Sequence, residues 1–342
     1  MKIIAKDNHE KPTEQDLASW QYQLSHCIKD IDSLSEYLEL DASQLAFSSA
    51  ASQDFQLKVP LPYANRMRKG DANDPLLLQV LPTSAELEYF PGFSTDPLQE
   101  ASAKALTGLI HKYKNRVLLT LSGACAINCR YCFRRHFPYA DNNIGSSQWQ
   151  KILDYIQADP SIEEVIFSGG DPLATPDKRI AKFVNDLDKI SHLQRLRIHT
   201  RLPVVIPQRI TEQLCSILQN SRLQSILVIH ANHANEFDAH VTSALNSLLA
   251  AKVTVLNQAV LLKGINDTLK AQKDLHIASF KAGALPYYLF VLDPVQGAAH
   301  FDVSDRQAQQ LIGELQAHLP GYLVPKLARE IPGRPNKTLL AI

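Results

Sequence analysis

The sequence predicts an α/β protein built around a partial (β/α)6 barrel of the TIM type, with an N-terminal helical region before it and a short C-terminal segment after it. Three observations predict this class. Short runs of apolar and β-branched residues recur from residue 116 onward, amphipathic helix-like segments lie between them, and the unit returns about every 30 residues. Strands that are buried on both faces and alternate with helices pair in parallel, so six such units favour a barrel or an open part-barrel.

The individual elements follow from the same patterns. Residues 13–40 are predicted to be helical, because Thr13 can cap an apolar pattern of helical spacing. Residues 59–97 are rich in Pro, Asp and Gly, which indicates an extended chain wrapping something larger, and residues 98–112 are predicted to form a helix. The predicted strands are 116–121, 163–169, 195–201, 226–231, 253–262 and 287–293. The predicted helices between them are 178–190, 208–220, 238–251 and 268–283.

These elements predict three parts of the chain. Residues 1–100 form a helical and extended wrapping region, residues 101–300 form the part-barrel, and residues 301–342 form a C-terminal helix and tail. In such an architecture ligands bind at the carboxyl ends of the strands. The polar or glycine-rich segments that follow or end the predicted strands should therefore converge on one mouth.

The charge balance excludes some function classes. Lys plus Arg and Asp plus Glu both total 35, so the formal net charge is zero, and no basic stripe indicates nucleic-acid binding. No apolar run approaches the ~18 residues needed to span a membrane. The stretch MKIIAKDNHE has no apolar core typical of a secretory signal, so a cytoplasmic protein is expected. Thiols stay reduced there, and clustered cysteines then indicate metal ligands or catalytic groups.

Three cysteines follow the first predicted strand with the spacing C-x3-C-x2-C: Cys125, Cys129 and Cys132. Iron–sulfur clusters are commonly held by four thiolates, so three would leave one iron open to a ligand. This run resembles the motif of the radical S-adenosylmethionine enzymes, in which S-adenosylmethionine occupies the open iron. Two alternatives are a Cys3His zinc site completed by His136 and a four-thiolate cluster, although Cys27 and Cys215 lie far away in sequence.

The segment SGGDPL at 168–173 follows the second predicted strand. Adjacent glycines let a backbone approach a ligand closely and expose its amide groups. Near the C-terminus, Lys337 follows the turn-rich stretch PGRPN, and a lysine held beside an apolar segment suits Schiff-base chemistry.

Together with these motifs, the segments HKY, FRR, TRLPVVIPQRI, HANH and NQAVLLKGIND resemble the lysine 2,3-aminomutase family from about Asp74 to Lys337. The resemblance implies a [4Fe-4S] cluster, S-adenosyl-L-methionine and pyridoxal 5′-phosphate (PLP) as cofactors. It implies an isomerase that converts L-lysine to β-lysine by moving the amino group from C2 to C3.

The resemblance also implies a role for each matching residue. Cys125, Cys129 and Cys132 match the cluster ligands, and Lys337 matches the lysine that binds PLP. The other matches are Lys112, Tyr113 and Arg116 for the PLP phosphate; Ser168, Gly169, Gly170 and Asp171 for the methionyl amino group; His230 and Gln258 for the lining of the cofactor pocket; Arg134 for the substrate carboxylate; and Asp293 and Glu330 for the substrate side-chain ammonium.

Two departures refine the resemblance. Typical members carry an aspartate where this chain has Glu330, and small residues where it has Arg334 and Pro335. The short tail after Lys337 is similar to the bacterial branch that supplies β-lysine for modification of elongation factor P by its lysyl ligase.

The resemblance also implies an electron donor such as flavodoxin or ferredoxin, and a homo-oligomer is compatible with it. The sequence leaves open whether the substrate is free lysine, another amino acid or a protein-bound lysyl group. Two other functions stay open, namely a radical methyl- or sulfur-transferring enzyme and a non-catalytic Cys3His module.

Overall fold

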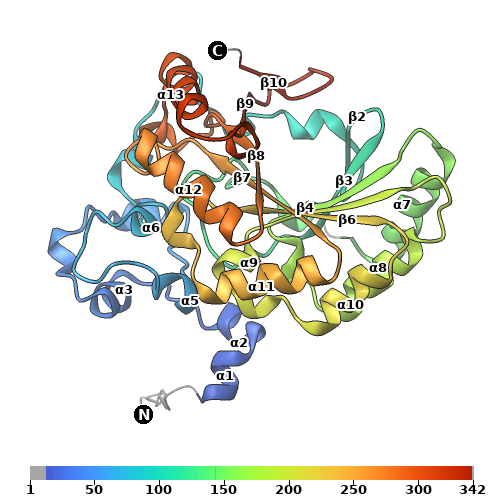
Figure 1. Ribbon diagram of the computed structural model, residues 1–342, viewed down its shortest axis with the longest axis horizontal. Coiled ribbons are helices and arrows are strands. Elements are labelled where there is room, and N and C mark those ends of the chain that lie inside the picture. The colour runs from blue at the N-terminus through green and yellow to red at the C-terminus, as the bar shows by residue number, and fades with distance from the viewer. Residues whose placement is uncertain (1–12, 143, 341–342) are drawn as a thin grey trace, which may run out of the picture.

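In the part of the chain that the structure describes, a single sheet of ten strands forms the centre of the molecule, and its strands lie side by side in chain order (Figure 1). The computed structural model describes residues 13–142 and 144–340. The strands are β1 Lys104–Leu106, β2 Leu109–Tyr113, β3 Arg116–Ser122, β4 Glu164–Gly169, β5 Arg195–Thr200, β6 Gln224–His230, β7 Thr254–Val260, β8 Leu285–Phe290, β9 Lys326–Arg329 and β10 Thr338–Leu339.

The sheet is an open part-barrel, as the sequence predicted. Strands β3 to β9 pair in parallel, whereas β1, β2 and β10 add antiparallel pairs at the two edges. Within the described residues β1 and β10 do not pair with each other, so the barrel does not close. The helices that follow successive parallel strands are α7 Ser146–Ala158, α8 Asp177–Leu187, α10 Glu212–Asn220, α11 Ala239–Ala250, α12 Leu269–Lys281 and α13 Asp305–His318.

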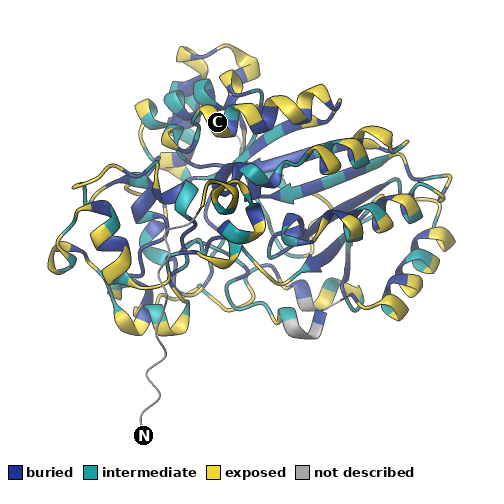
Figure 2. Ribbon diagram, turned by 90° about the horizontal axis from the view of Figure 1, so that it is seen from below, coloured by how far each residue is buried: buried dark blue, intermediate teal, exposed yellow. Residues whose placement is uncertain are grey.

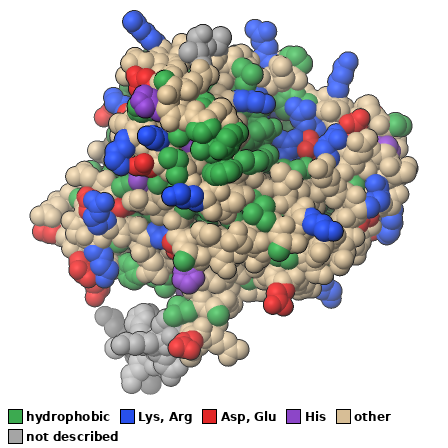
Figure 3. All heavy atoms as spheres, viewed as in Figure 1, with side chains coloured by type: hydrophobic (Ala, Val, Ile, Leu, Met, Phe, Trp, Pro, Cys, Tyr) green, Lys and Arg blue, Asp and Glu red, His purple; other side chains and the backbone are tan. Residues whose placement is uncertain are grey.

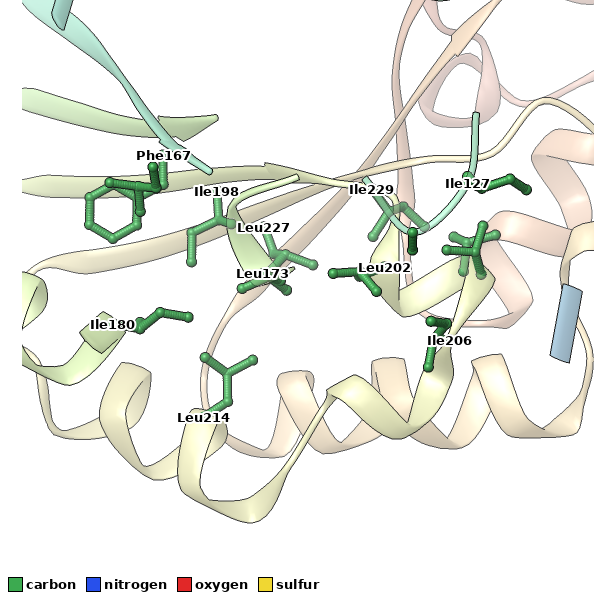
Figure 4. Close-up of a cluster of buried hydrophobic side chains, with 14 of the residues drawn as sticks. Ile127, Phe167, Leu173, Ile180, Ile198, Leu202, Ile206, Leu214, Leu227 and Ile229 are labelled. Carbon is green, nitrogen blue, oxygen red and sulfur yellow. The ribbon is translucent and has the colours of Figure 1, made fainter. Parts of the chain in front are cut away.

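The strands alternate between a helix-facing side and an interior side. Side chains such as Phe167 and Ile198 point from the strands toward Ile180 of α8 and Leu214 of α10 (Figure 4). In Figure 2 the strands are mostly buried, while the helices turn exposed residues outward. Each fully buried side chain of this size contributes about 1.5–3 kcal/mol of hydrophobic stabilisation, so this layer fixes which residues of each strand face the interior.

The N-terminal region is less regular than predicted. The expected helix over 13–40 is divided into three, because Ser19 and Asp30 each cap a new helix with their side chains. The short helices before the sheet are α1 Glu14–Ala18, α2 Trp20–Ser25, α3 Ile31–Leu38, α4 Ser49–Asp54, α5 Leu61–Ala64 and α6 Pro75–Leu78. One more short helix, α9 Leu202–Val205, follows β5. The 3₁₀ turns are η1 Ala42–Gln44, η2 Ser84–Leu87, η3 Glu100–Ala103, η4 Tyr139–Asn142, η5 Pro172–Ala174, η6 Pro207–Arg209, η7 Ala234–Glu236, η8 Ala299–Phe301 and η9 Gly321–Leu323.

The helix predicted over residues 98–112 is wrong. This stretch forms the 3₁₀ turn η3 and then the hairpin of β1 and β2. Gly108 supplies the positive φ of 79° that the turn needs, and Leu109 pairs with Leu119 of β3. Long-range pairing with β3 therefore overrides the local helical pattern.

The wrapping region packs into the same core as the barrel. Trp20, Leu34, Tyr63 and Leu76 belong to one hydrophobic cluster with the strand residues, and Figure 1 shows this region beside the sheet. The division into three parts at residues 100 and 300 stays a prediction. No helix in the described part of the chain is long and apolar enough to cross a membrane. The segment MKIIAKDNHE, on which the expectation about secretion depends, lies outside the described residues.

A buried ion pair joins the wrapping region to the cysteine loop. Glu86 accepts hydrogen bonds from Arg130 at 2.9 and 2.5 Å and lies 2.9 Å from Arg135. Both Glu86 and Arg130 are almost fully buried.

We predict that Glu86→Ala lowers the free energy of unfolding by about 3–5 kcal/mol, because it leaves buried guanidinium groups without a carboxylate. Urea denaturation measures this value. Glu163→Ala is the control, because Glu163 and its partner Arg195 are partly exposed, and it should cost less than about 1 kcal/mol. Equal losses in the two variants would contradict the prediction.

Candidate active site

A cavity of about 870 Å³ opens over the interior of the sheet. Every residue to which the family resemblance gave a role lines this one cavity: Lys112, Tyr113, Arg116, Cys125, Cys129, Cys132, Arg134, Ser168, Gly169, Gly170, Asp171, His230, Gln258, Asp293, Glu330 and Lys337. The expected convergence of the strand ends therefore occurs. In Figure 3 a group of hydrophobic side chains gathers near the centre of the visible face, with lysines and arginines near it.

The cysteine loop follows β3 and is held mainly by contacts from the wrapping region. Lys58 donates through Nζ to the carbonyl of Cys125 at 2.6 Å, and the side chain of Asn128 donates to the carbonyl of Gln56 at 2.9 Å. The amide of Arg130 donates to the carbonyl of Gln79 at 2.9 Å. These bonds replace the regular secondary structure that the loop lacks, so the wrapping region fixes where the thiols lie.

The surroundings of two of the three thiols disfavour their ionisation. Burial, followed by Cys132, Asp171 and Cys129, raises the pKa of Cys125 well above its usual value. Burial and then Cys129 raise the pKa of Cys132 to about 11. A cation would favour the ionised form of both thiols, and iron supplies that charge in a thiolate-bound cluster.

Within the described ranges, no three His, Cys, Asp or Glu side chains converge so as to hold a single metal ion. Each thiolate of a cubane cluster binds a different iron, so a cluster does not need such convergence. A Cys3His zinc site does need it, and His136 instead lies with Nε2 at 3.3 Å from the carbonyl of Gln296. The loop therefore fits a cluster better than a zinc ion.

The glycine motif packs directly against the cysteine loop. A Cβ atom on Gly170 would lie 2.7 Å from the carbonyl oxygen of Ala124, and one on Gly169 would lie 2.4 Å from that of Ser122. The Asp171 carboxylate accepts hydrogen bonds from Thr200 Oγ1 and from the amide of Arg201, at 2.6 and 2.7 Å. Asp171 thus holds the end of β5 in place, and the glycines allow two backbones to lie in contact.

The opposite end of the cavity holds the C-terminal lysine. Lys337 Nζ donates to Glu330 at 2.5 Å, and Tyr113 Oη donates to the other oxygen of Glu330 at 3.0 Å. Lys112 lies 3.5 Å from the same carboxylate. Arg116 lies with its guanidinium 4.1 Å from the centre of the Tyr113 ring. These cations surround one end of the pocket, as a phosphate group requires.

One residue that lines this pocket also has a buried polar atom without a partner among the described residues. His199, on the interior side of β5, has no hydrogen-bond partner at Nε2 among the described residues. Burial and the nearby cations Arg197, Lys337 and Arg134 keep its pKa well below its usual value, so the ring is neutral. A polar ligand would satisfy this nitrogen, which the cavity alone does not. With Lys337 and the cations above, these residues fit PLP.

Several polar residues of the site received no specific role from the sequence. Arg201 donates from Nη1 to Cys129 Sγ at 2.6 Å and is paired with Glu236 at 2.9 Å. Glu100 pairs with Arg134. The segment HTR at 199–201 ends a predicted strand and was therefore among those expected at the mouth, where His199 and Arg201 lie, whereas nothing local distinguishes Glu100 from other carboxylates.

Comparison with known proteins identifies the family. The chain is 51% identical to L-lysine 2,3-aminomutase of Haemophilus influenzae over 341 residues, which cover 100% of both proteins. The chain belongs to the lysine 2,3-aminomutase family. Another family member, L-lysine 2,3-aminomutase of Escherichia coli, is 50% identical over 96% of this chain and 95% of its own length.

A family model and a longer relative agree with this family. Residues 119–268 match the Radical SAM superfamily. L-lysine 2,3-aminomutase of Clostridium subterminale is 32% identical over 95% of this chain, and the match covers 78% of that longer protein. A solved structure of native anSMEcpe with bound AdoMet aligns with 59% of this chain and 58% of its own, at 12% identity and a TM-score of 0.45.

We predict that Gly170→Ala weakens iron binding, because the new Cβ would displace the backbone of the cysteine loop. Such overpacking typically costs about 1–3 kcal/mol. Iron and sulfide content after anaerobic reconstitution measures the effect. Gly145→Ala is the control, because a Cβ there meets nothing within 4 Å. Normal iron content in Gly170→Ala would contradict the prediction.

A second prediction concerns Asp293, whose pKa burial and then Glu330 raise from 3.8 to about 7. The folded state therefore favours the protonated carboxyl, and stability is lost as the pH rises between these two values. At pH 8 the free energy of unfolding of Asp293→Asn should thus exceed that of the wild type by up to about 4 kcal/mol. At pH 3 the two proteins should have the same free energy of unfolding. Denaturation of the cofactor-free proteins at both pH values measures the difference, and a pH-independent difference would refute it.

Proposed function

We propose that this chain converts L-lysine to β-lysine by moving the amino group from C2 to C3. One observation carries the proposal: a single cavity joins the three-cysteine loop to Lys337. When bound, the cluster and S-adenosylmethionine supply an organic radical able to remove hydrogen from an unactivated carbon, and PLP supplies a conjugated system that stabilises the radical during amino migration.

Different residues of the cavity would bind the cluster, S-adenosylmethionine and PLP. Cys125, Cys129 and Cys132 would hold the cluster, and the backbone of Gly169 and Gly170 would lie against S-adenosylmethionine. Lys337 would hold PLP, with Lys112, Tyr113 and Arg116 near its phosphate. His230 and Gln258, on neighbouring strands, would line the space between the two cofactors.

Lysine carries a carboxylate at one end and an ammonium group at the other, so a site that binds it needs a cation at one end and an anion at the other. Arg134 would pair with the α-carboxylate, because a guanidinium offers two parallel donors to a carboxylate. Asp293 and Glu330 would pair with the side-chain ammonium. The positive charge of that ammonium would lower the raised pKa of Asp293 and favour its ionised form. Once PLP engages Lys337, the Glu330 oxygen that Lys337 now contacts becomes available to the substrate, while Tyr113 still donates to the other oxygen.

Several finer points belong to the same proposal. We infer that the electron donor is a small redox protein such as flavodoxin or ferredoxin. We also infer that the β-lysine produced serves modification of elongation factor P. The match with the short relatives over nearly their whole length supports this branch. A cytoplasmic location and an assembly of identical chains are further proposals of the same kind.

The test is an anaerobic incubation of the reconstituted protein with L-lysine, S-adenosylmethionine and dithionite, followed by chromatography with mass detection of β-lysine. Borohydride reduction and peptide mapping locate PLP. Methylated or sulfur-containing products without β-lysine, or a PLP adduct away from Lys337, would refute the proposal.

We predict that Arg134→Lys raises the KM for lysine about 10- to 100-fold, the equivalent of about 1.5–3 kcal/mol lost with the bidentate charged contact. Lys337→Ala should remove both the PLP adduct and β-lysine formation. Steady-state kinetics of the reconstituted proteins measure the first effect. Lys151→Ala, on α7 outside the cavity, serves as the control and should leave KM unchanged.

A further inference from the structure

Glu100 has no role in the function described so far, although it makes the closest contact to Arg134. Its two oxygens accept hydrogen bonds from Nε and Nη2 of Arg134, both at 2.7 Å. Both side chains are buried, with 7% of Arg134 and 6% of Glu100 exposed. Glu100 therefore occupies one complete edge of the guanidinium, the edge formed by Nε and Nη2.

The second edge of the guanidinium is only weakly held. Nη1 donates to Ser168 Oγ at 3.0 Å and, over a longer 3.4 Å, to the carbonyl of Gly169. A guanidinium carries five N–H donors in a fixed plane. After these contacts, one donor on Nη2 has no partner among the described residues, and the 3.4 Å bond of Nη1 is longer than a typical hydrogen bond. Nη1 and Nη2 form the tip of the side chain, which lies in the wall of the cavity.

Nearby residues of the wrapping region, which lies outside the barrel, fix the position of Glu100. The amide of Glu100 donates to Asp96 Oδ1 at 3.1 Å. A little earlier, Ser94 exchanges backbone hydrogen bonds of 2.9 Å with Pro294 and Gln296, which follow Asp293. One short segment of the wrapping region thus connects the predicted carboxylate end of the substrate site with its predicted ammonium end.

We propose that Glu100 is a positioning residue, which fixes Arg134 so that its Nη1–Nη2 edge receives the α-carboxylate of the substrate. This inference rests on the proposed function. Glu100 stays in place when substrate binds, because breaking a buried pair is costly and the incoming carboxylate would only replace one already present. The alternative, in which Glu100 blocks the site until substrate displaces it, predicts the opposite effect of its removal.

The experiment compares two ligands that differ in the carboxylate. L-lysine and cadaverine, which lacks the α-carboxylate, are titrated into the PLP-loaded, cluster-containing protein, and binding is followed by the PLP absorbance. Glu100→Gln should weaken lysine binding about 10- to 100-fold and leave cadaverine binding unchanged. The KM for lysine should rise in parallel, with a smaller change in kcat.

Conservative and control variants complete the design. Glu100→Asp keeps the charge and should restore part of the affinity for lysine, which a purely steric role would not require. Glu163→Gln removes a carboxylate outside the cavity and should bind both ligands as the wild type does. Iron content and PLP absorbance establish that each variant is loaded.

Three outcomes would overturn the inference: tighter lysine binding by Glu100→Gln, unchanged lysine binding, or equal weakening for lysine and cadaverine. Failure of the proposed function gives a different pattern. If Arg134 does not bind the carboxylate, Arg134→Gln itself will leave the ratio of the two affinities unchanged.

Discussion

Buried pairs of arginine and glutamate hold the cysteine loop and the strand ends around it. The loop has no regular secondary structure of its own between β3 and η4, and the pairs around it come from the wrapping region and from the segment after β6. They are Arg130 with Glu86, Arg134 with Glu100, and Arg201 with Glu236. Each carboxylate compensates a charge that would otherwise be costly to bury, so each arginine keeps one geometry. The thiols, Ser168 and the floor of the cavity take their positions from this arrangement.

The barrel strands could be predicted because their burial is periodic and local. β4 is buried along its whole length, and the apolar run that predicted it matches the structure within one residue. The strand β9 was missed because it has only four residues and both its ends are charged. The hairpin of β1 and β2 was missed because its pairing with β3 is a tertiary contact that a local pattern does not contain.

The site residues likewise fall into those that a local motif indicates and those that only the fold brings together. The cysteine spacing and the PGxxxK segment are compact motifs, and the sequence indicated their residues directly. The position of HTR at the end of a predicted strand indicated where His199 lies, but the contact of Glu100 with Arg134 could not be inferred, because it depends on which distant side chain the fold brings close. The pocket largely balances its own charges, with Glu330 beside Lys337 and Glu100 beside Arg134. Under the proposed function a charged ligand exchanges partners at Glu330, whereas Glu100 stays paired with Arg134.

Lys337 directly precedes β10, which has two residues and, within the described part of the chain, pairs with β9 alone at the open edge of the sheet. So short an edge strand opens at a low free energy, whereas the cysteine loop is enclosed by buried pairs. The part of the cavity wall that carries Lys337 can therefore open locally while the part that carries the thiols stays folded.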